Sequence, residues 1–95
     1  MHVASCKAIR LFCARHPEAK KPLDRWYDVA GAAVWANFID VRQSFNTADF
    51  VAPHVVFDIG GNKYRLIAEI NFRKKALFIR HIMTHNEYEK GAWKR

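Results

Sequence analysis

Five side chains in the second half of the sequence are of the types that can cleave RNA: Lys63, Arg65, Arg80, His85 and Tyr88. Attack of a 2′-hydroxyl on its phosphate needs one group to take the hydroxyl proton, another to protonate the departing 5′-oxygen, and cations to offset the phosphate charge. Histidine titrates nearest neutral pH, so His85 is the candidate for proton transfer. Tyr88 could stack on a base or share the proton transfer. Equally, His85 could be a histidine that only hydrogen-bonds, and Tyr88 could anchor a final helix to the core.

Three consecutive strands would position these residues. Val55–Ile59 is a β-branched and aromatic run that stops at Gly60-Gly61, and two glycines can take the positive φ of a two-residue hairpin turn. Lys63–Phe72 alternates like a half-buried strand, and Ala76–Thr84 gives another strand after the charged turn Arg73-Lys74-Lys75. The pattern predicts a three-stranded antiparallel meander.

The hairpin turn also predicts a register. A two-residue turn places Phe57 opposite Tyr64 and Val56 opposite Arg65. Tyr64 then belongs to the face that apolar residues must cover, whereas Arg65 lies on the open face, where its removal should cost little packing. Arg80 lies beside Arg65 if the third strand pairs with the second, which gives a cationic patch on a rigid floor.

The charged residues of this patch could instead be ordinary surface residues with no role in chemistry. Lys63 can pair with Asp58, and Arg65 with Glu69, as solvated ion pairs. Such pairs are common on protein surfaces and contribute little to stability. Patterning alone leaves both interpretations open.

Two N-terminal helices are the natural cover for the apolar face of the meander. The first follows Ser5, a candidate N-cap, and ends before Pro17; its apolar positions are Cys6, Ile9, Phe12 and Cys13. The second is expected to be regular from Pro22 onward, with an apolar stripe formed by Leu23, Trp26, Tyr27, Ala30, Ala33 and Val34. Met1–Ala4 is short and apolar enough for an edge strand, and residues 40–45 for a short helix.

Length and charge bound the class of protein. A chain of 95 residues, of which 51% are hydrophobic, is long enough for one domain, residues 1–95, with its own core. The net charge of +7 indicates an anionic partner such as RNA, DNA or an acidic protein. Residues 53–95 hold nine Lys/Arg against four Asp/Glu, so the basic excess belongs to the strand half.

Several other classes of site lack their signals. His81 and His85 would be about 13 Å apart on an extended segment, and no thiol or carboxylate stands at ligand spacing, so we expect neither a metal nor a cofactor. Cys6 and Cys13 fall two helical turns apart, beyond disulfide reach, as for free thiols in a reducing cytoplasm. No apolar run reaches the length of a membrane span, and no signal peptide is visible.

The residues of the candidate site also resemble a known family. The segments Ile59–Ile67, Phe78–Arg80 and Thr84–Tyr88 resemble the HigB-type toxins of bacterial type II toxin–antitoxin pairs, which are similar to the wider RelE-like group of mRNA interferases. Trp35 followed by Asp40-Val41-Arg42 fits the same pattern. Met83, where a glycine is frequent, and Glu89, where an aspartate is common, depart from it.

The resemblance implies an α+β fold with two N-terminal helices on a small antiparallel sheet and a short C-terminal helix. It implies a cytoplasmic endoribonuclease without a metal, an mRNA substrate, in some relatives on the ribosome, and neutralisation by a HigA-type antitoxin, through which alone operator DNA would be contacted. On this basis the catalytic candidates are Arg65, Arg80, His85 and Tyr88, and the RNA-binding candidates are Lys63, Arg73, Lys74, Lys75 and Lys90. The alternative is a non-catalytic RNA- or protein-binding domain of the same fold.

Overall fold

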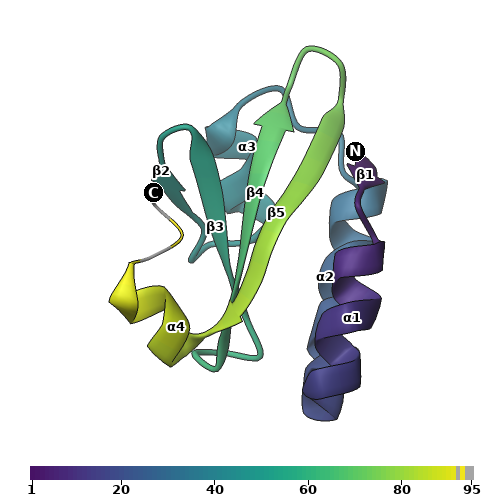
Figure 1. Cartoon of the computed structure of the whole chain (residues 1–95). Helices are drawn as coiled ribbons and strands as arrows, with labels where there is room; N and C mark the ends of the chain where they lie inside the picture. The colour runs from purple at the N-terminus through teal and green to yellow at the C-terminus, as the bar shows by residue number, and fades with distance from the viewer. Residues whose placement is uncertain (92, 94–95) are drawn as a thin grey trace.

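A five-stranded sheet organises the chain, as the computed structural model shows for residues 1–91 and 93 (Figure 1). The strands are β1 (His2–Ala4), β2 (Asp49–Val51), β3 (His54–Ile59), β4 (Tyr64–Asn71) and β5 (Ala76–Thr84). The helices are α1 (Lys7–Arg15), α2 (Lys20–Ala32), α3 (Phe38–Ser44) and α4 (His85–Lys90), with a 3₁₀ turn at Pro17–Ala19. The α+β class predicted from the sequence is confirmed.

The predicted meander forms the centre of this sheet. The strand order is β1-β5-β4-β3-β2, and β3, β4 and β5 pair antiparallel as expected. The expected N-terminal edge strand exists but pairs parallel with β5, so the sheet is mixed, and the expectation of an antiparallel sheet is wrong there. Strand β2 was not predicted, because three residues are too few to display an alternating pattern.

The predicted hairpin register is wrong by two residues. Phe57 lies opposite Leu66, and Ile59 lies opposite Tyr64, because residues 60–63 form a longer loop than the expected two-residue turn. Gly60 and Gly61 do take positive φ values of 64° and 71°. Side chains alternate with a period of two along a strand, so a two-residue shift leaves the predicted faces of β4 unchanged. Tyr64 and Leu66 are accordingly buried in the core.

The register of β4 and β5 separates Arg80 from Arg65, and the ladder also contains a β-bulge. Ile67 pairs with His81 and Ala68 with Ile79, which leaves Arg80 as the extra residue. The residue opposite Arg65 is Met83. The predicted neighbourhood of Arg65 and Arg80 is therefore wrong, because the register sets Arg80 three residues along β5 from Met83, the residue that faces Arg65.

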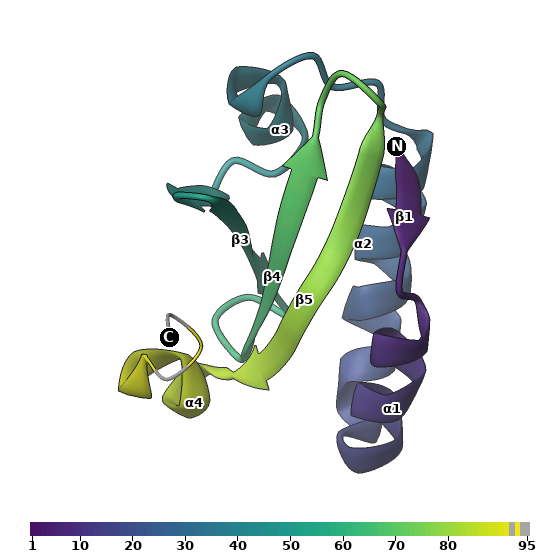
Figure 2. The same ribbon diagram turned by 45° about the horizontal axis from the view of Figure 1, so that its top comes forward.

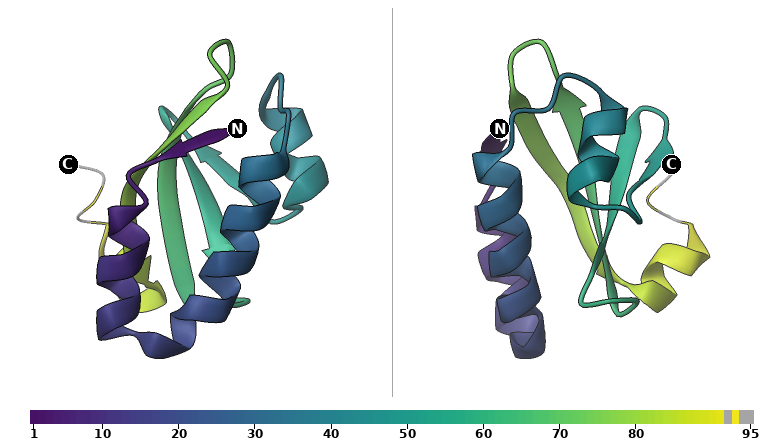
Figure 3. Two further views of the ribbon diagram at one scale, coloured as in Figure 1. Left: turned by 90° about the vertical axis from the view of Figure 1, so that its right-hand side faces the viewer. Right: turned by 180° about the vertical axis from the view of Figure 1, so that it is seen from behind.

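Helices α1 and α2 cover one face of the sheet, as predicted (Figures 2 and 3). Phe12, Leu23, Trp26 and Ala30 are buried in the core between helices and sheet. Pro17 ends the first helix as expected, since α1 stops at Arg15 and the 3₁₀ turn begins at the proline.

Four details of these helices differ from the prediction. Ser5 is not the N-cap of α1; it has a φ of 70°, and Cys6 occupies the cap position without a side-chain hydrogen bond. Helix α2 begins at Lys20, two residues before Pro22, because the 3₁₀ turn runs directly into it. Val34 lies beyond the end of α2 and is exposed, so it does not belong to the apolar stripe. Tyr27 is also exposed.

A hydrogen bond ties the helical layer to the start of β4. The Tyr64 hydroxyl donates to Oε1 of Glu18 at 2.7 Å, and the Tyr64 ring packs edge-on against Phe12. This hydrogen bond lowers the pKa of the Glu18 carboxyl and raises the pKa of the Tyr64 hydroxyl. The end of the sheet that carries Arg65 is thus held from the helical side.

The other face of the sheet carries a second, smaller apolar cluster. Val56, Ile67 and Trp93 are buried there, with Met83 and Tyr88 packed against them. Helix α4 lies at the end of the sheet where the β3–β4 loop turns, opposite the β4–β5 turn (Figure 1). This cluster attaches α4 to the sheet face that α1 and α2 leave open.

The core predicts a clear contrast between two leucine substitutions. Leu66→Ala removes a side chain that is 0% exposed. It should lower the free energy of unfolding by about 3 kcal/mol, through lost burial and the remaining cavity. Leu11 is 59% exposed. Leu11→Ala should therefore change that free energy by less than about 0.5 kcal/mol. Urea unfolding of both variants measures the difference, and equal losses would contradict the assignment of the β4 faces.

Candidate active site

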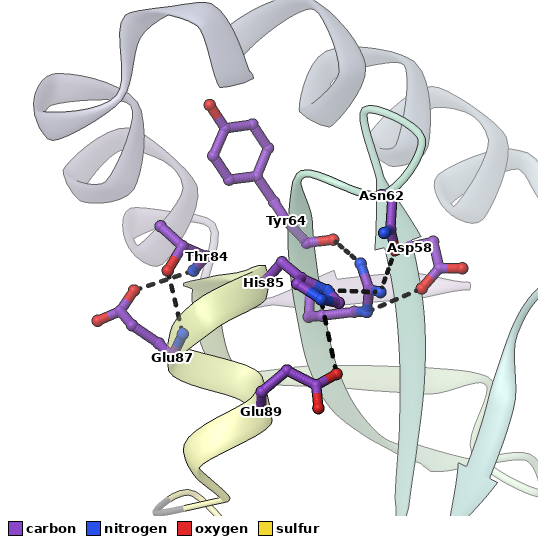
Figure 4. A network of polar contacts seen from close by, with 8 residues as sticks. Asp58, Asn62, Tyr64, Thr84, His85, Glu87 and Glu89 are labelled. Carbon is purple, nitrogen blue, oxygen red and sulfur yellow. Dashed lines mark hydrogen bonds and ion pairs between the residues drawn. The ribbon is translucent and has the colours of Figure 1, made fainter.

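The guanidinium of Arg65, on β4, is the centre of a polar network. Figure 4 labels its partners Asp58, Asn62, Tyr64 and His85. Its Nε lies 3.0 Å from Oδ1 of Asp58, and an Nη1 hydrogen is donated to the Tyr64 carbonyl at 3.0 Å. Its Nη2 donates to Oδ1 of Asn62 at 2.5 Å and to Nδ1 of His85 at 3.1 Å. Contacts among the described residues therefore use four of the five N–H donors of this side chain.

Arg65 is not an open-face residue in the sense that the sequence predicted. It is only 8% exposed, although it does lie on the face of β4 away from α1 and α2. The alternative interpretation, in which the charges form ordinary surface ion pairs, also named the wrong partners. Asp58 pairs with Arg65, and Glu69 pairs with Arg80 at 3.1 Å. The register explains why Asp58 pairs with Arg65, because the two residues lie directly opposite each other on β3 and β4.

The start of α4 places His85 beside Arg65. Thr84 caps this helix: its hydroxyl accepts from the Glu87 amide at 3.2 Å, and Oε1 of Glu87 accepts from the Thr84 amide at 2.9 Å. Gly91 ends the helix with a φ of 71°. The spacing Thr-x-x-Glu is a capping box, a sequence signal that would have located the first helical residue. The His85 amide further donates to the Lys63 carbonyl at 2.9 Å.

The contacts of His85 define which of its nitrogens carries a proton. Arginine can only donate, so Nδ1 of His85 accepts the hydrogen bond from Arg65. In the neutral ring the proton then resides on Nε2, which lies 3.6 Å from Oε1 of Glu89 one turn along α4. The imidazole is about one third exposed.

Two aromatic contacts hold Tyr88. The Arg65 guanidinium carbon lies 5.5 Å from the centre of the Tyr88 ring, and the Trp93 ring stacks on it with centroids 5.4 Å apart. Burial raises the pKa of the Tyr88 hydroxyl; Asp49 adds to the rise, and Arg65 opposes it. Tyr88 therefore keeps its proton at neutral pH and can donate it. The predicted anchoring role of Tyr88 is also seen, since Trp93 belongs to the second apolar cluster.

A cleft of about 340 Å³ opens beside Arg65 and Tyr88. Its other lining residues are Arg42, Thr47, Ala48, Asp49, Val56 and Asp58. The sequence analysis did not propose Arg42, Thr47 or Asp49 as site residues, although Arg42 belongs to the family pattern; they come from α3, β2 and the segment between them. That segment has no sustained period, so nothing in it indicated that it would reach the strand residues.

Of the other predicted residues, two lie near this network. Lys63 is exposed in the β3–β4 loop and its carbonyl meets the His85 amide. Lys90 is exposed in the last turn of α4. Arg80 lies farther along the sheet, with its guanidinium on Glu69 and over the Phe78 ring. Glu69 is four residues from Arg65, or about 13 Å along the strand.

Three predicted RNA-binding residues lie at the opposite end of the sheet. Arg73, Lys74 and Lys75 form the exposed β4–β5 turn, which the whole length of β4 separates from the β3–β4 loop. At the usual rise of a strand this separation is roughly 25 Å. Lys75 also donates to the Trp35 carbonyl at 3.0 Å. The structure therefore brings together Arg65, His85 and Tyr88, with Lys63 and Lys90 nearby, but not Arg80 or the turn.

Across residues 1–91 and 93, no group of three or more His, Cys, Asp or Glu side chains is placed to hold a metal ion. Within the same residues, no helix has both the length and the apolar character needed to cross a bilayer.

The fold and site define a small basic α+β protein in which an arginine and a tyrosine line a polar cleft and a histidine is hydrogen-bonded to the arginine. A family model described as "HigB_toxin, RelE-like toxic component of a toxin-antitoxin system" matches residues 19–91. The chain therefore belongs to the HigB toxin family, as the sequence resemblance indicated.

Curated relatives cover nearly the whole chain. The mRNA interferase HigB of Escherichia coli O6:H1 (strain CFT073) is 36% identical over 94 residues, which span 95% of this chain and 90% of that protein. The mRNA interferase toxin HigB of Escherichia coli (strain K12) is 27% identical over 92 residues, with 94% and 88% coverage.

The burial of Arg65 changes what its removal should do. Arg65→Ala leaves the partly buried Asp58 carboxylate without its cation and should lower the free energy of unfolding by about 2 kcal/mol. Arg42→Ala, an exposed arginine of the same cleft, should cost less than about 0.5 kcal/mol. Urea unfolding at neutral pH compares the two. Equal stability of both variants would show that the Arg65 network does not hold the fold.

The capping box makes α4 sensitive to acid. The hydrogen bond from the Thr84 amide lowers the pKa of the Glu87 carboxyl below its ordinary value of 4.5. The ionised carboxylate therefore stabilises the folded chain above that ordinary value, and this contribution is lost as the pH falls through the lowered folded pKa. Glu87→Gln keeps an acceptor for the Thr84 amide but has no titrating proton.

We therefore expect the stability difference between wild type and Glu87→Gln to be constant near neutral pH and to shrink in acid. Unfolding free energies from neutral pH down into the acid range, through the ordinary carboxyl pKa, measure it. Because Glu18 titrates in both proteins, its own acid dependence cancels in the difference. A difference that does not change with pH would mean that the Glu87 carboxylate does not cap α4.

Proposed function

We propose that this chain is the toxin of a type II toxin–antitoxin pair and an endoribonuclease that cleaves mRNA. The observation that carries the proposal is the contact of Arg65 with both His85 and Tyr88, in a member of the HigB toxin family whose Arg65 and Tyr88 line a polar cleft. The names of the relatives support an mRNA substrate. The net charge of +7 supports binding to a polyanion.

The cleft can hold a phosphodiester against Arg65. One Nη1 hydrogen remains for a phosphate oxygen after the contacts to Asp58, Asn62, Tyr64 and His85. A second can come from Nη2 if the phosphate replaces a neutral acceptor there. The guanidinium would then offset the charge that builds on the phosphate during attack. Because the Arg65 side chain is already held in place in the folded protein, it needs little reorganisation to stabilise the reacting phosphate.

The reaction proposed is attack by the ribose 2′-oxygen of the substrate. The bond between the 2′-oxygen and phosphorus forms as the bond between phosphorus and the 5′-oxygen breaks, which yields a cyclic phosphate and a free 5′-hydroxyl. His85 takes the 2′-hydroxyl proton at Nδ1, and the Tyr88 hydroxyl gives its proton to the departing 5′-oxygen. The proton on His85 returns to Tyr88 through solvent, which regenerates the protein.

The remaining basic residues are proposed to bind the RNA away from the reacting phosphate. Lys63 and Lys90 flank the site, and Arg80 lies about 13 Å along the sheet by the strand spacing. The turn at residues 73–75 would contact a distant part of the substrate or the ribosome. Such contacts raise affinity and association rate, and salt weakens them.

The biological setting follows from the same proposal. The protein would act on mRNA in the cytoplasm, with or without the ribosome, on a RelE-like fold. A HigA-type antitoxin would neutralise it, and operator DNA would be contacted through the antitoxin. Membership of the HigB toxin family is what supports these parts of the proposal.

Induced expression of matched variants tests the proposal. Wild type should arrest growth and produce discrete mRNA cuts, visible as new 5′ ends. His85→Gln removes the proton acceptor, and Tyr88→Phe removes the proton donor while keeping the ring that stacks on Trp93. Each should slow cleavage by about a hundredfold. His81→Gln and Tyr27→Phe change exposed residues outside the cleft and should cleave like wild type.

The contrary result is equally specific. If wild type accumulates in soluble form while growth continues and the mRNA stays intact, the chain is a binding domain of this fold and not a ribonuclease. If cleavage occurs but Tyr88→Phe cleaves at the wild-type rate, another group protonates the 5′-oxygen.

A further inference from the structure

The proposed proton acceptor is blocked in the free protein. The lone pair of His85 Nδ1 is engaged by an Nη2 hydrogen of Arg65 at 3.1 Å, and Nε2 already carries the proton of the neutral ring. Adding a proton at Nδ1 would set an N–H of the ring against an N–H of the guanidinium. While this contact lasts, neither nitrogen of His85 can take a proton from a substrate hydroxyl.

The hydrogen bonds of the Arg65 guanidinium are of two kinds. Those of Nε and Nη1 hold the side chain in place, whereas those of Nη2 can be exchanged for another acceptor. Nε is held by the Asp58 carboxylate at 3.0 Å, and Nη1 by the Tyr64 backbone. The first of these is a charge-assisted bond. Among residues 1–91 and 93, the partners of Nη2 are both neutral acceptors, Oδ1 of Asn62 and Nδ1 of His85. Neither acceptor belongs to a strand, because Asn62 lies in an exposed loop and His85 at the first position of α4.

A phosphate oxygen is a better acceptor for the Nη2 hydrogens of Arg65 than Asn62 or His85 is. A charged oxygen forms a shorter and roughly twice as strong hydrogen bond with a guanidinium as a neutral acceptor does. The cleft reaches Arg65, so a phosphate bound there can compete with the imidazole for Nη2. Once displaced, His85 has a free lone pair at Nδ1, still close to the phosphate whose neighbouring 2′-hydroxyl must lose its proton.

We propose that the substrate phosphate itself activates His85, by taking over the Nη2 donor of Arg65 and releasing the Nδ1 lone pair. The inference rests on the proposed ribonuclease function and assigns Arg65 a second task besides binding the phosphate. The released imidazole takes the 2′-hydroxyl proton as the bond from the 2′-oxygen to phosphorus forms. The imidazolium then lies between the anionic phosphate and the Glu89 carboxylate, which is 3.6 Å from Nε2, and both favour its charge.

Nitrogen-15 NMR of the histidine side chains tests this directly on the full chain. The chemical shift of Nδ1 distinguishes a lone pair that accepts a hydrogen bond from a free one and from a protonated nitrogen. The probe is a short RNA in which the attacking 2′-hydroxyl is replaced by hydrogen, so that it binds but cannot be cleaved. His81 is exposed and, unlike His85, is not among the described contacts of Arg65, so it serves as an internal control in the same spectra.

Without the probe, we expect His85 as the Nε2–H tautomer with Nδ1 hydrogen-bonded, and a scalar coupling between Nδ1 and Nη2 of Arg65. At saturating probe, that coupling should vanish and Nδ1 should move to the free or protonated position, while His81 stays unchanged. Arg65→Lys, which retains a cation but lacks the fork of donors, should show a released Nδ1 even without the probe.

The outcomes separate this inference from the proposed function. If wild type cleaves RNA and binds the probe while Nδ1 stays bonded to Arg65, the activation is wrong but the ribonuclease stands. If Nδ1 is already free in the unbound protein, or if the probe fails to bind, the activation is wrong too. Loss of all RNA cleavage by wild type would instead refute the proposed function. Should Arg65→Lys not fold, the wild-type spectra still decide.

Discussion

The buried guanidinium of Arg65 is the interaction on which the site depends, because it joins separate pieces of the chain at one point. It connects β4 to β3 through Asp58, to the β3–β4 loop through Asn62, and to α4 through His85. Burying a charge is costly unless nearly all of its hydrogen bonds are satisfied. The geometry of the loop and of α4 is therefore tied to the position of this one side chain.

Helix α4 illustrates the same dependence from the other direction. A helix of six residues is far too short to be stable alone in water. Its two ends are satisfied by the capping box of Thr84 and Glu87 and by Gly91, and its body is attached through Tyr88 to the cluster around Trp93. The helix exists because the sheet holds it, and it presents His85 where the sheet holds Arg65.

Charge is distributed differently at the two ends of the sheet. Near α4, Arg65 and His85 face the carboxylates of Asp58 and Glu89. The turn at residues 73–75 instead presents three consecutive basic residues to solvent, one of which reaches the Trp35 carbonyl. Partly paired charges are suited to fixed geometry, whereas exposed cations are suited to long-range attraction of a polyanion. One small sheet thus offers two kinds of basic surface.

The sequence by itself determined the meander β3–β4–β5, the two covering helices, the faces of β4 and the basic character. These follow from local periodicity, from Pro17 and from the glycines at the hairpin, all of which act over a few residues. It also indicated Arg65, His85 and Tyr88, helped by the family resemblance. The sequence could not determine how far apart two segments lie in space when no local pattern relates them.

Only the tertiary structure decided the register, the bulge and the partners of the charges. Residues 60–63 loop out, so Asp58 rather than Glu69 faces Arg65, and the β4–β5 register sets Met83 rather than Arg80 opposite Arg65. The segment with Arg42 and Asp49 joins the cleft only through packing and through the pairing of β2 with β3. Loop length and bulges depend on the balance of many packing contacts across the sheet, and that balance is not written in any local stretch of the chain.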